Sequence, residues 1–231
     1  PHGTSRRQRQ MCIRDSSVAN GFENQVRSSI IGFAAHIKLG TFHDRGVEDY
    51  EQVMTRVDSV RYVVGSAPYI ESKALIASPR RQDFVQIKAV DPEREQTVTS
   101  LLDNIIRGEL NFGMIEGQEE DPRRRRAYPG IILGRWLSDQ LDVTLTQRVQ
   151  VLIPSGIQAR GLLSGAEWRT FRVSGIFETG LYEYDNLFAF IGIEEGQKLT
   201  KMSDMVTGIQ IKLNDIDNSN HAADLISDKL G

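Results

Sequence analysis

The chain has 231 residues, a formal net charge of −3 and an ordinary globular composition, with 39% hydrophobic and 26% charged residues. This balance excludes a disordered, collagen-like or disulfide-rich chain, and the slight acidity argues against a nucleic-acid-binding protein of overall basic character. The length allows one large domain or two small ones, with a sizeable buried core.

Residues 1–16 differ from everything that follows. They hold four arginines, no periodic apolar pattern and the only cysteine of the chain, Cys12. The string RRQRQMCIRDS resembles a translated sequencing-library adapter, so we expect an artefact or a disordered leader and leave this segment out of the fold. A natural basic tail is the alternative interpretation.

The next part of the chain predicts a helix, a strand and a second helix. Apolar residues recur every four positions from Val18 to Ile30, which is typical of an amphipathic helix. No convincing cap precedes Val18, so we expect this helix to continue one that lies upstream. A strand is predicted at 34–39, a turn at 44–46 and a helix at 47–57. Residues 61–64 and 69–77 are β-rich, with an expected break at 66–68 that includes Pro68.

The middle of the chain mixes strands and helices without a regular order. Strands are predicted at 84–89, 131–133, 148–153, 170–177 and 187–193, and helices at 93–106, 135–141 and 194–200. A strand at 207–213 and a helix at 220–230 end the sequence, and we expect further chain beyond them. This irregular mixture indicates an α+β fold, with a β-rich insertion between two outer parts that each pair a strand with a helix.

Motifs for catalysis or metal binding are missing from the sequence. It has no Gly-rich phosphate loop and no nucleophile elbow, and its four histidines are scattered. No apolar run is long enough to span a bilayer. We therefore expect neither a catalytic residue nor a cofactor. A stand-alone soluble enzyme is an alternative only if the natural protein begins at Pro1.

Three segments carry possible binding surfaces. Residues 154–168, PSGIQARGLLSGAEW, lie between two predicted strands, and they either fold back on themselves or protrude as an arm with apolar side chains. Residues 175–185 form either a binding surface or a strand–turn–strand corner with packed tyrosines. Arg123–Arg126 could attract anionic lipid headgroups, but the preceding acidic residues favour a self-neutralised loop.

Several segments together resemble the LolC/LolE family of lipoprotein-releasing system permeases. Residues 17–23, SVANGFE, are similar to the family's S-V-M-N-G-F-E, which follows the first membrane helix. Ile132-Leu-Gly134 with Leu137, Leu141 and Val143 resembles its I-L-G-x-x-L-A-x-x-L-x-V pattern. Residues 175–178 and 182–185 resemble G-x-F-E-x-G-x-x-E-Y-D, and residues 207–213 continue the order. The resemblance runs from Ser17 to the end of the chain.

The resemblance implies a MacB-like periplasmic fold. A Porter subdomain would be built from residues 17–66 and 206–231, and a β-rich Sabre subdomain would be inserted at 67–205. It implies a permease in the inner membrane of a Gram-negative bacterium, with this region facing the periplasm. Its implied partners are a second permease subunit, a cytoplasmic ATPase, lipoprotein substrates and a periplasmic lipoprotein carrier, with no nucleic acid. A MacB-like or FtsX-like export or signalling permease is the alternative.

The resemblance also implies where the carrier binds. In LolC-like members a hairpin "hook" engages the carrier, and its position matches the segment from Pro154 to Trp168. Ile157, Leu162 and Leu163 would fill the apolar groove of the carrier, with Arg160 and Arg169 at the rim. The family's "pad" beside the hook departs here, because Gln150 stands where an Arg is expected and Trp168 where a Gln is expected. A C-type, an E-type and an undivided permease all stay open.

Overall fold

The structure is a computed structural model, and it describes residues 35–41, 46–117, 126–153 and 168–230. Its helices are α2 (Tyr50–Asp58), α3 (Pro92–Val98), α4 (Arg135–Leu141), α5 (Tyr182–Leu187), α6 (Ile193–Thr200) and α7 (Ser219–Leu230), with 3-10 turns at Leu102–Asn104 and Ile216–Asn218. Its strands are β1 (Ile37–Gly40), β2 (Val63–Ala77), β3 (Gln82–Val90), β4 (Ile105–Gly108), β5 (Met114–Ile115), β6 (Tyr128–Gly134), β7 (Arg148–Leu152), β8 (Trp168–Phe177), β9 (Phe188–Gly192) and β10 (Gly208–Leu213). Helices and a mixed sheet make the fold α+β, as the sequence predicts.

Six of the strands close into a barrel. Strand β2 pairs with β3, β3 with β9, β9 with β6, β6 with β8, β8 with β7, and β7 again with β2. The side chains that alternate inward fill the interior and are almost completely buried: Ile70, Ala74, Ile76, Val85, Ile87, Ala89, Ile131, Leu133, Val149, Val151, Phe171, Val173, Ala189 and Ile191. The barrel is therefore a packed core and not a channel.

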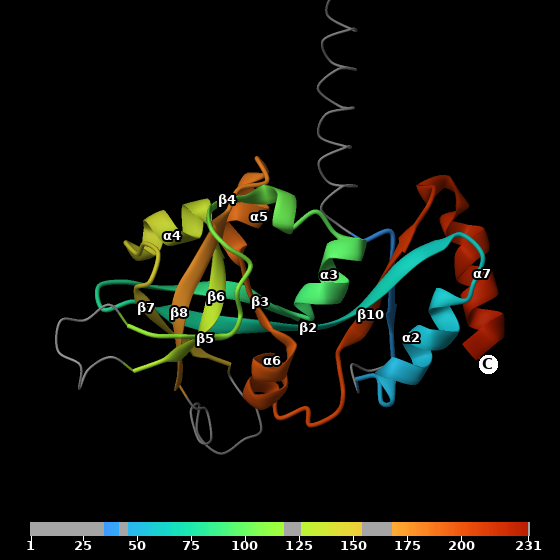
Figure 1. The fold of residues 1–231 in the computed structure, drawn as a ribbon, viewed down its shortest axis with the longest axis horizontal. Coiled ribbons are helices and arrows are strands. Elements are labelled where there is room, and N and C mark those ends of the chain that lie inside the picture. Colours follow the sequence, from blue (N-terminus) through green and yellow to red (C-terminus); the bar gives the residue numbers. More distant parts are fainter. Residues whose placement is uncertain (1–34, 42–45, 118–125, 154–167, 231) are drawn as a thin grey trace, which may run out of the picture.

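A smaller three-stranded part extends from the barrel. The first half of β2 pairs with β10, and β10 pairs with β1, so β2 belongs to both parts (Figure 1). Ile209, Ile211 and Leu213 of β10 pack with Met54 of α2 and Ile226 of α7. Helices α2 and α7 lie next to each other at this end of the molecule (Figure 1).

Two predicted boundaries are wrong because distant pairing outweighs local signals. Strand β2 runs unbroken through Pro68, which lies where pairing passes from β10 to β3 at Tyr69. The helix predicted at 93–106 ends at Val98, since Ile105 already pairs with Phe177 of β8. The division into Porter residues 17–66 and 206–231 and Sabre residues 67–205 stays a prediction.

The described helices include none with the length and apolar character needed to cross a bilayer. The helix predicted from Val18 to Ile30 and the segment 1–16 lie outside the described residues.

His36 joins the first strand to the end of β10. Its Nδ1 accepts a hydrogen bond from the backbone N–H of Leu213 at 3.2 Å, which requires this nitrogen to be unprotonated. Burial lowers the pKa of His36 below its ordinary value of 6.5, Lys212 lowers it further, and Asp215 opposes both.

We expect the stability of the protein to fall at mildly acidic pH partly through His36. Because its folded-state pKa is lowered, its contribution is fully present above about pH 6.5 and is lost as the pH falls toward the folded-state pKa. Urea unfolding at pH 7.5 and pH 5.5 measures this effect. His36→Asn keeps a hydrogen-bond acceptor but cannot titrate. In this variant the urea midpoints at pH 7.5 and pH 5.5 should therefore differ less than in the original protein, and an unchanged difference would contradict the prediction.

Candidate functional site

The described part of the site predicted from the sequence lies at the start of β8, which pairs with β7. Strands β7 and β8 are antiparallel and are paired from Arg148–Arg172 up to Leu152–Trp168. The chain segment that connects them therefore starts and ends on two neighbouring, hydrogen-bonded strands of the barrel. Pro154, Ile157, Arg160, Leu162 and Leu163 lie outside the described residues, whereas Trp168 and Arg169 are described.

Trp168 and Arg169 lie on opposite faces of β8. Adjacent residues of a strand point to opposite sides, and Trp168 points outward with 46% of its surface exposed. Arg169 points toward α6, where its Nη1 lies 2.7 Å from Glu195 Oε2. The other oxygen of Glu195, Oε1, accepts a hydrogen bond from Lys198 Nζ at 2.6 Å. The structure thus does not place these two predicted site residues on one surface.

Gln150 lies on the outer face together with Trp168. It is exposed, and it stands opposite Thr170 on β8 and Ala77 on β2. Its amide offers hydrogen bonds to a partner but no charge. The outer face of the hairpin therefore carries Gln150 and Trp168, whereas Arg169 is held by Glu195.

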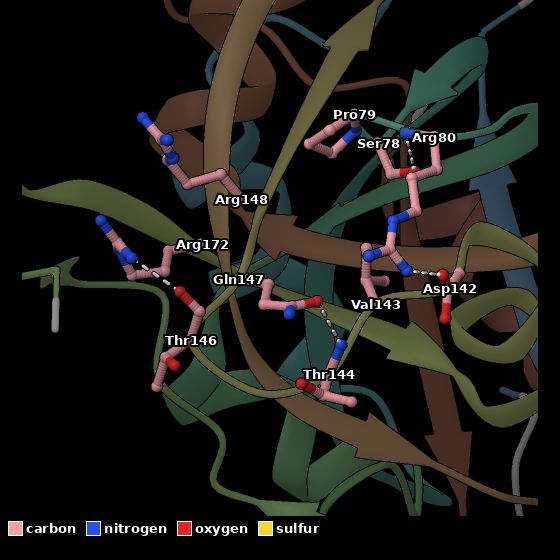
Figure 2. Close-up of a pocket in the computed structure, with 10 residues that line it drawn as sticks. All are labelled: Ser78, Pro79, Arg80, Asp142, Val143, Thr144, Thr146, Gln147, Arg148 and Arg172. Atoms are coloured by element: carbon pink, nitrogen blue, oxygen red, sulfur yellow. Dashed lines mark hydrogen bonds and ion pairs between the residues drawn. The ribbon is translucent and has the colours of Figure 1, made fainter. Parts of the chain in front are cut away.

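A cavity of about 530 Å³ lies beside this outer face (Figure 2). One wall is the turn after β2 with Ser78, Pro79 and Arg80, and the other is the chain between α4 and β7 together with Arg148 and Arg172. The full lining is Ser78, Pro79, Arg80, Asp142, Val143, Thr144, Thr146, Gln147, Arg148 and Arg172. The sequence prediction did not find this cavity, because Arg148 and Arg172 meet only through the β7–β8 register.

Hydrogen bonds and an ion pair connect the residues that line the cavity. Arg80 forms an ion pair with Asp142, and Gln147 Oε1 accepts a hydrogen bond from Thr144 N at 3.0 Å (Figure 2). The buried guanidinium of Arg172 donates to the carbonyl of Thr146 at 2.6 Å. Ser78 Oγ donates to Leu141 O at 2.8 Å. The contacts of Arg80 and Ser78 thus connect the turn after β2 to the end of α4 and the residue that follows it.

Residues 175–185 form a strand, a turn and a helix, so the expected strand–turn–strand corner is wrong. Asp185 is buried and accepts hydrogen bonds from Thr179 N at 2.7 Å, Thr179 Oγ1 at 2.8 Å and Gly180 N at 3.2 Å. A Cβ at Gly134 would lie only 2.1 Å from the carbonyl oxygen of Asp185. Two motifs of the family resemblance, ILG and EYD, therefore pack directly against each other.

The described residues hold no group of three or more His, Cys, Asp or Glu side chains that could bind a metal ion. Tyr50 and Lys212 have shifted pKa values, but both lie away from the hairpin. Burial raises the pKa of Tyr50 and lowers that of Lys212.

Comparison with known proteins finds sequence relatives that belong to one family. The chain is 30% identical over 219 residues to the lipoprotein-releasing system transmembrane protein LolC of Xylella fastidiosa, which covers 94% of this chain and 48% of that protein. It is 27% identical to LolC of Neisseria meningitidis serogroup B (88% and 46%) and 23% identical to LolE of Haemophilus influenzae (86% and 45%). No family model matches.

The chain spans about half the length of these curated relatives. Among solved structures, it resembles the periplasmic region of MacB from Actinobacillus actinomycetemcomitans, with a TM-score of 0.51 and 14% identity over 87% of this chain and 85% of that one. At this identity the likeness concerns the fold alone. Over most of its length, the chain is thus related in sequence to the LolC/LolE lipoprotein-releasing system permeases, and it has the α+β fold of a MacB periplasmic region.

Proposed function

We propose that this chain is the periplasm-facing domain of an inner-membrane ABC-transporter permease that releases lipoproteins and passes them to a soluble periplasmic carrier. The names of its relatives support lipoprotein release, and its fold supports a periplasmic position. A second permease subunit and a cytoplasmic ATPase complete the transporter. ATP hydrolysis belongs to that ATPase. This chain therefore binds partner proteins and takes part in conformational coupling, but it does not catalyse a reaction.

The observation that carries the proposal is the β7–β8 hairpin. Its strands are paired up to Leu152 and Trp168, so the barrel gives the intervening segment a fixed base. Ile157, Leu162 and Leu163 in that segment are the apolar groups that would enter the lipid-accepting groove of the carrier. The barrel also gives the proposed division a physical basis, with Sabre at 67–205 and Porter at 17–66 and 206–231.

A binding measurement tests the proposal. The complete permease complex, in detergent, is immobilised and titrated with the purified periplasmic lipoprotein carrier of the same organism. We expect Leu162→Asp with Leu163→Asp to weaken binding about tenfold or more, because a carboxylate opposes burial in an apolar groove. Met114→Asp is the matched control, since Met114 is 67% exposed on β5. Equal binding by the double variant and the control would refute the hand-off.

The MacB-like fold supports a second candidate, an export or signalling permease of the MacB or FtsX type. The sequence of the flanking genes separates the two. The lipoprotein system predicts a short ATPase gene next to this one and four membrane helices in the full permease. A fused ATPase domain or a different neighbourhood would favour the second candidate.

A further inference from the structure

The barrel and the smaller part meet along one strand, β2. Its pairing passes from β10 to β3 at Tyr69, so β10 and β3 lie on opposite sides of β2. One face of these three strands is apolar, with Ile209 of β10, Ile70 of β2 and Ala89 of β3 in the hydrophobic core. Apolar contacts have no fixed direction, so they join the two parts without setting a precise angle between them.

The opposite face of the same strands carries polar side chains. Residues that stand opposite each other in antiparallel strands project to one face, as Lys38 and Gln210 do in β1 and β10, and Glu71 and Lys88 in β2 and β3. Ala67 of β2 stands opposite Gln210, and Glu71 lies four positions further along β2, so both pairs share this face. Helix α3 packs against β2 and β10 at the same junction (Figure 1).

Glu71 of β2 joins the smaller part to the barrel on the polar face. Its Oε2 accepts a hydrogen bond from Lys38 Nζ of β1 at 3.2 Å, and its Oε1 accepts one from Gln86 Nε2 of β3 at 3.2 Å. Its backbone N–H also donates to Thr207 Oγ1, just before β10, at 3.2 Å. One residue of the shared strand thus binds a strand of each part.

A second set of contacts connects β10 directly to β3. Lys88 Nζ of β3 donates to Gln210 Oε1 of β10 at 2.8 Å, and both side chains bind the carboxylate of Glu95 on α3. Glu95 is 1% exposed and Gln210 is completely buried. We call the six side chains of both sets the junction network: Lys38, Glu71, Gln86, Lys88, Glu95 and Gln210.

Burial of the second set costs free energy, and this cost indicates what the junction network does. A buried ion pair with its hydrogen bonds commonly stabilises a fold no better than apolar residues of the same volume. What hydrogen bonds add is position, because each holds its two heavy atoms within about 2.7–3.2 Å and weakens when its angle changes. The donors and acceptors come from both parts, so a rotation of one part on the other would break several bonds together.

We infer that the junction network fixes the orientation of the smaller part on the barrel, so that the two move as one rigid body. Strand β1 and helix α7 belong to the smaller part, whereas β7 and β8 belong to the barrel. A displacement that reaches the smaller part would then carry β7 and β8 with it. This role goes beyond the proposed function, and it is the same for either candidate transporter.

Spin labels on the two parts of the complete permease complex test this role. Gln140 on α4 and Ser227 on α7 are exposed, and Gln140→Cys with Ser227→Cys provides the label sites in a permease whose other cysteines are replaced. Each complex carries one labelled chain, and double electron–electron resonance gives the distribution of the distance between the labels. We expect one narrow distribution. A broad or two-peaked distribution would overturn the inference without any further substitution.

Removing the buried polar groups separates orientation from stability. Lys88→Met, Glu95→Leu and Gln210→Leu together leave no charge of the second set unpaired, and Glu93→Leu is the matched control at an exposed position of α3. We expect the triple variant to keep its urea midpoint within about 0.5 M and to widen the distance distribution about twofold, whereas the control changes neither. A triple variant with the control's narrow distribution would overturn the inference.

A second variant decides the question if the triple variant does not fold. Lys38→Met with Glu71→Met interrupts the first set of contacts at side chains that are 53% and 22% exposed, so it does not require a buried site to repack. This double variant should also widen the distance distribution, because β1 loses its contact with β2 and β3. A width equal to that of the control would then overturn the inference.

Discussion

Replacing Phe171 with alanine is expected to lower the free energy of unfolding by about 3–5 kcal/mol. Phe171 on β8 is completely buried and is among the largest side chains inside the barrel. Its neighbours come from strands that pair around the whole ring, so they cannot move inward without disturbing several ladders. A cavity would stay behind, and its lining would lose contacts that nothing replaces.

Phe84→Ala is the matched control for Phe171→Ala, because it removes the same side chain from the outside of the same barrel. Phe84 is 73% exposed, so we expect a change within about 1 kcal/mol. Urea unfolding followed by circular dichroism gives both values. A loss below about 1 kcal/mol for Phe171→Ala would mean that the barrel interior is loosely packed.

Elements with a strong local pattern could be predicted from the sequence. The helix Arg135–Leu141 and the strands around Ile131, Val149 and Ile211 lie where their periodicity places them. Each of these elements buries one face, so the spacing of its apolar residues shows whether it is a helix or a strand. The inward side chains of β3, Val85, Ile87 and Ala89, follow the same rule.

Elements that depend on partners far away in the chain could not be predicted. Pro68 signals a break, yet pairing with both β10 and β3 carries the strand across it. Ile105 fits the helical pattern of the preceding residues, but its pairing with Phe177 makes it a strand. Tyr182 to Asp185 form a helix because Asp185 binds back to Thr179 and Gly180. Local propensity is a weak guide in such places.

The candidate site shows the same limit. Trp168 and Arg169 point to opposite faces because they are neighbours in a strand. Their adjacency is visible in the sequence. The position of Phe84 next to Leu75, Leu152 and Trp168 depends on three registers, which no single strand reveals. The hook was therefore predicted from the family resemblance, whereas the neighbours of Phe84 are known only from the structure.

A buried polar cluster carries the second large expected effect. Glu95 of α3 is 1% exposed, and its Oε1 lies 3.3 Å from Lys88 Nζ of β3 and accepts a hydrogen bond from Thr99 Oγ1 at 2.9 Å. Its Oε2 accepts a hydrogen bond from Gln210 of β10, which is completely buried. Lys88 Nζ also donates to Gln210 Oε1 at 2.8 Å. The cluster thus links β10 of the smaller part to β3 of the barrel.

Glu95→Ala is expected to lower the free energy of unfolding by about 3–5 kcal/mol, because it leaves the charge of Lys88 buried without its carboxylate. Glu93→Ala on the same helix removes an exposed carboxylate and should cost less than about 1 kcal/mol. Urea unfolding compares the two, and equal losses would contradict a role for the cluster. Hydrogen exchange adds a test of place: with Glu95→Ala, amides of β10 should lose protection before those of β6 inside the barrel, because Gln210 of β10 donates a hydrogen bond directly to Glu95.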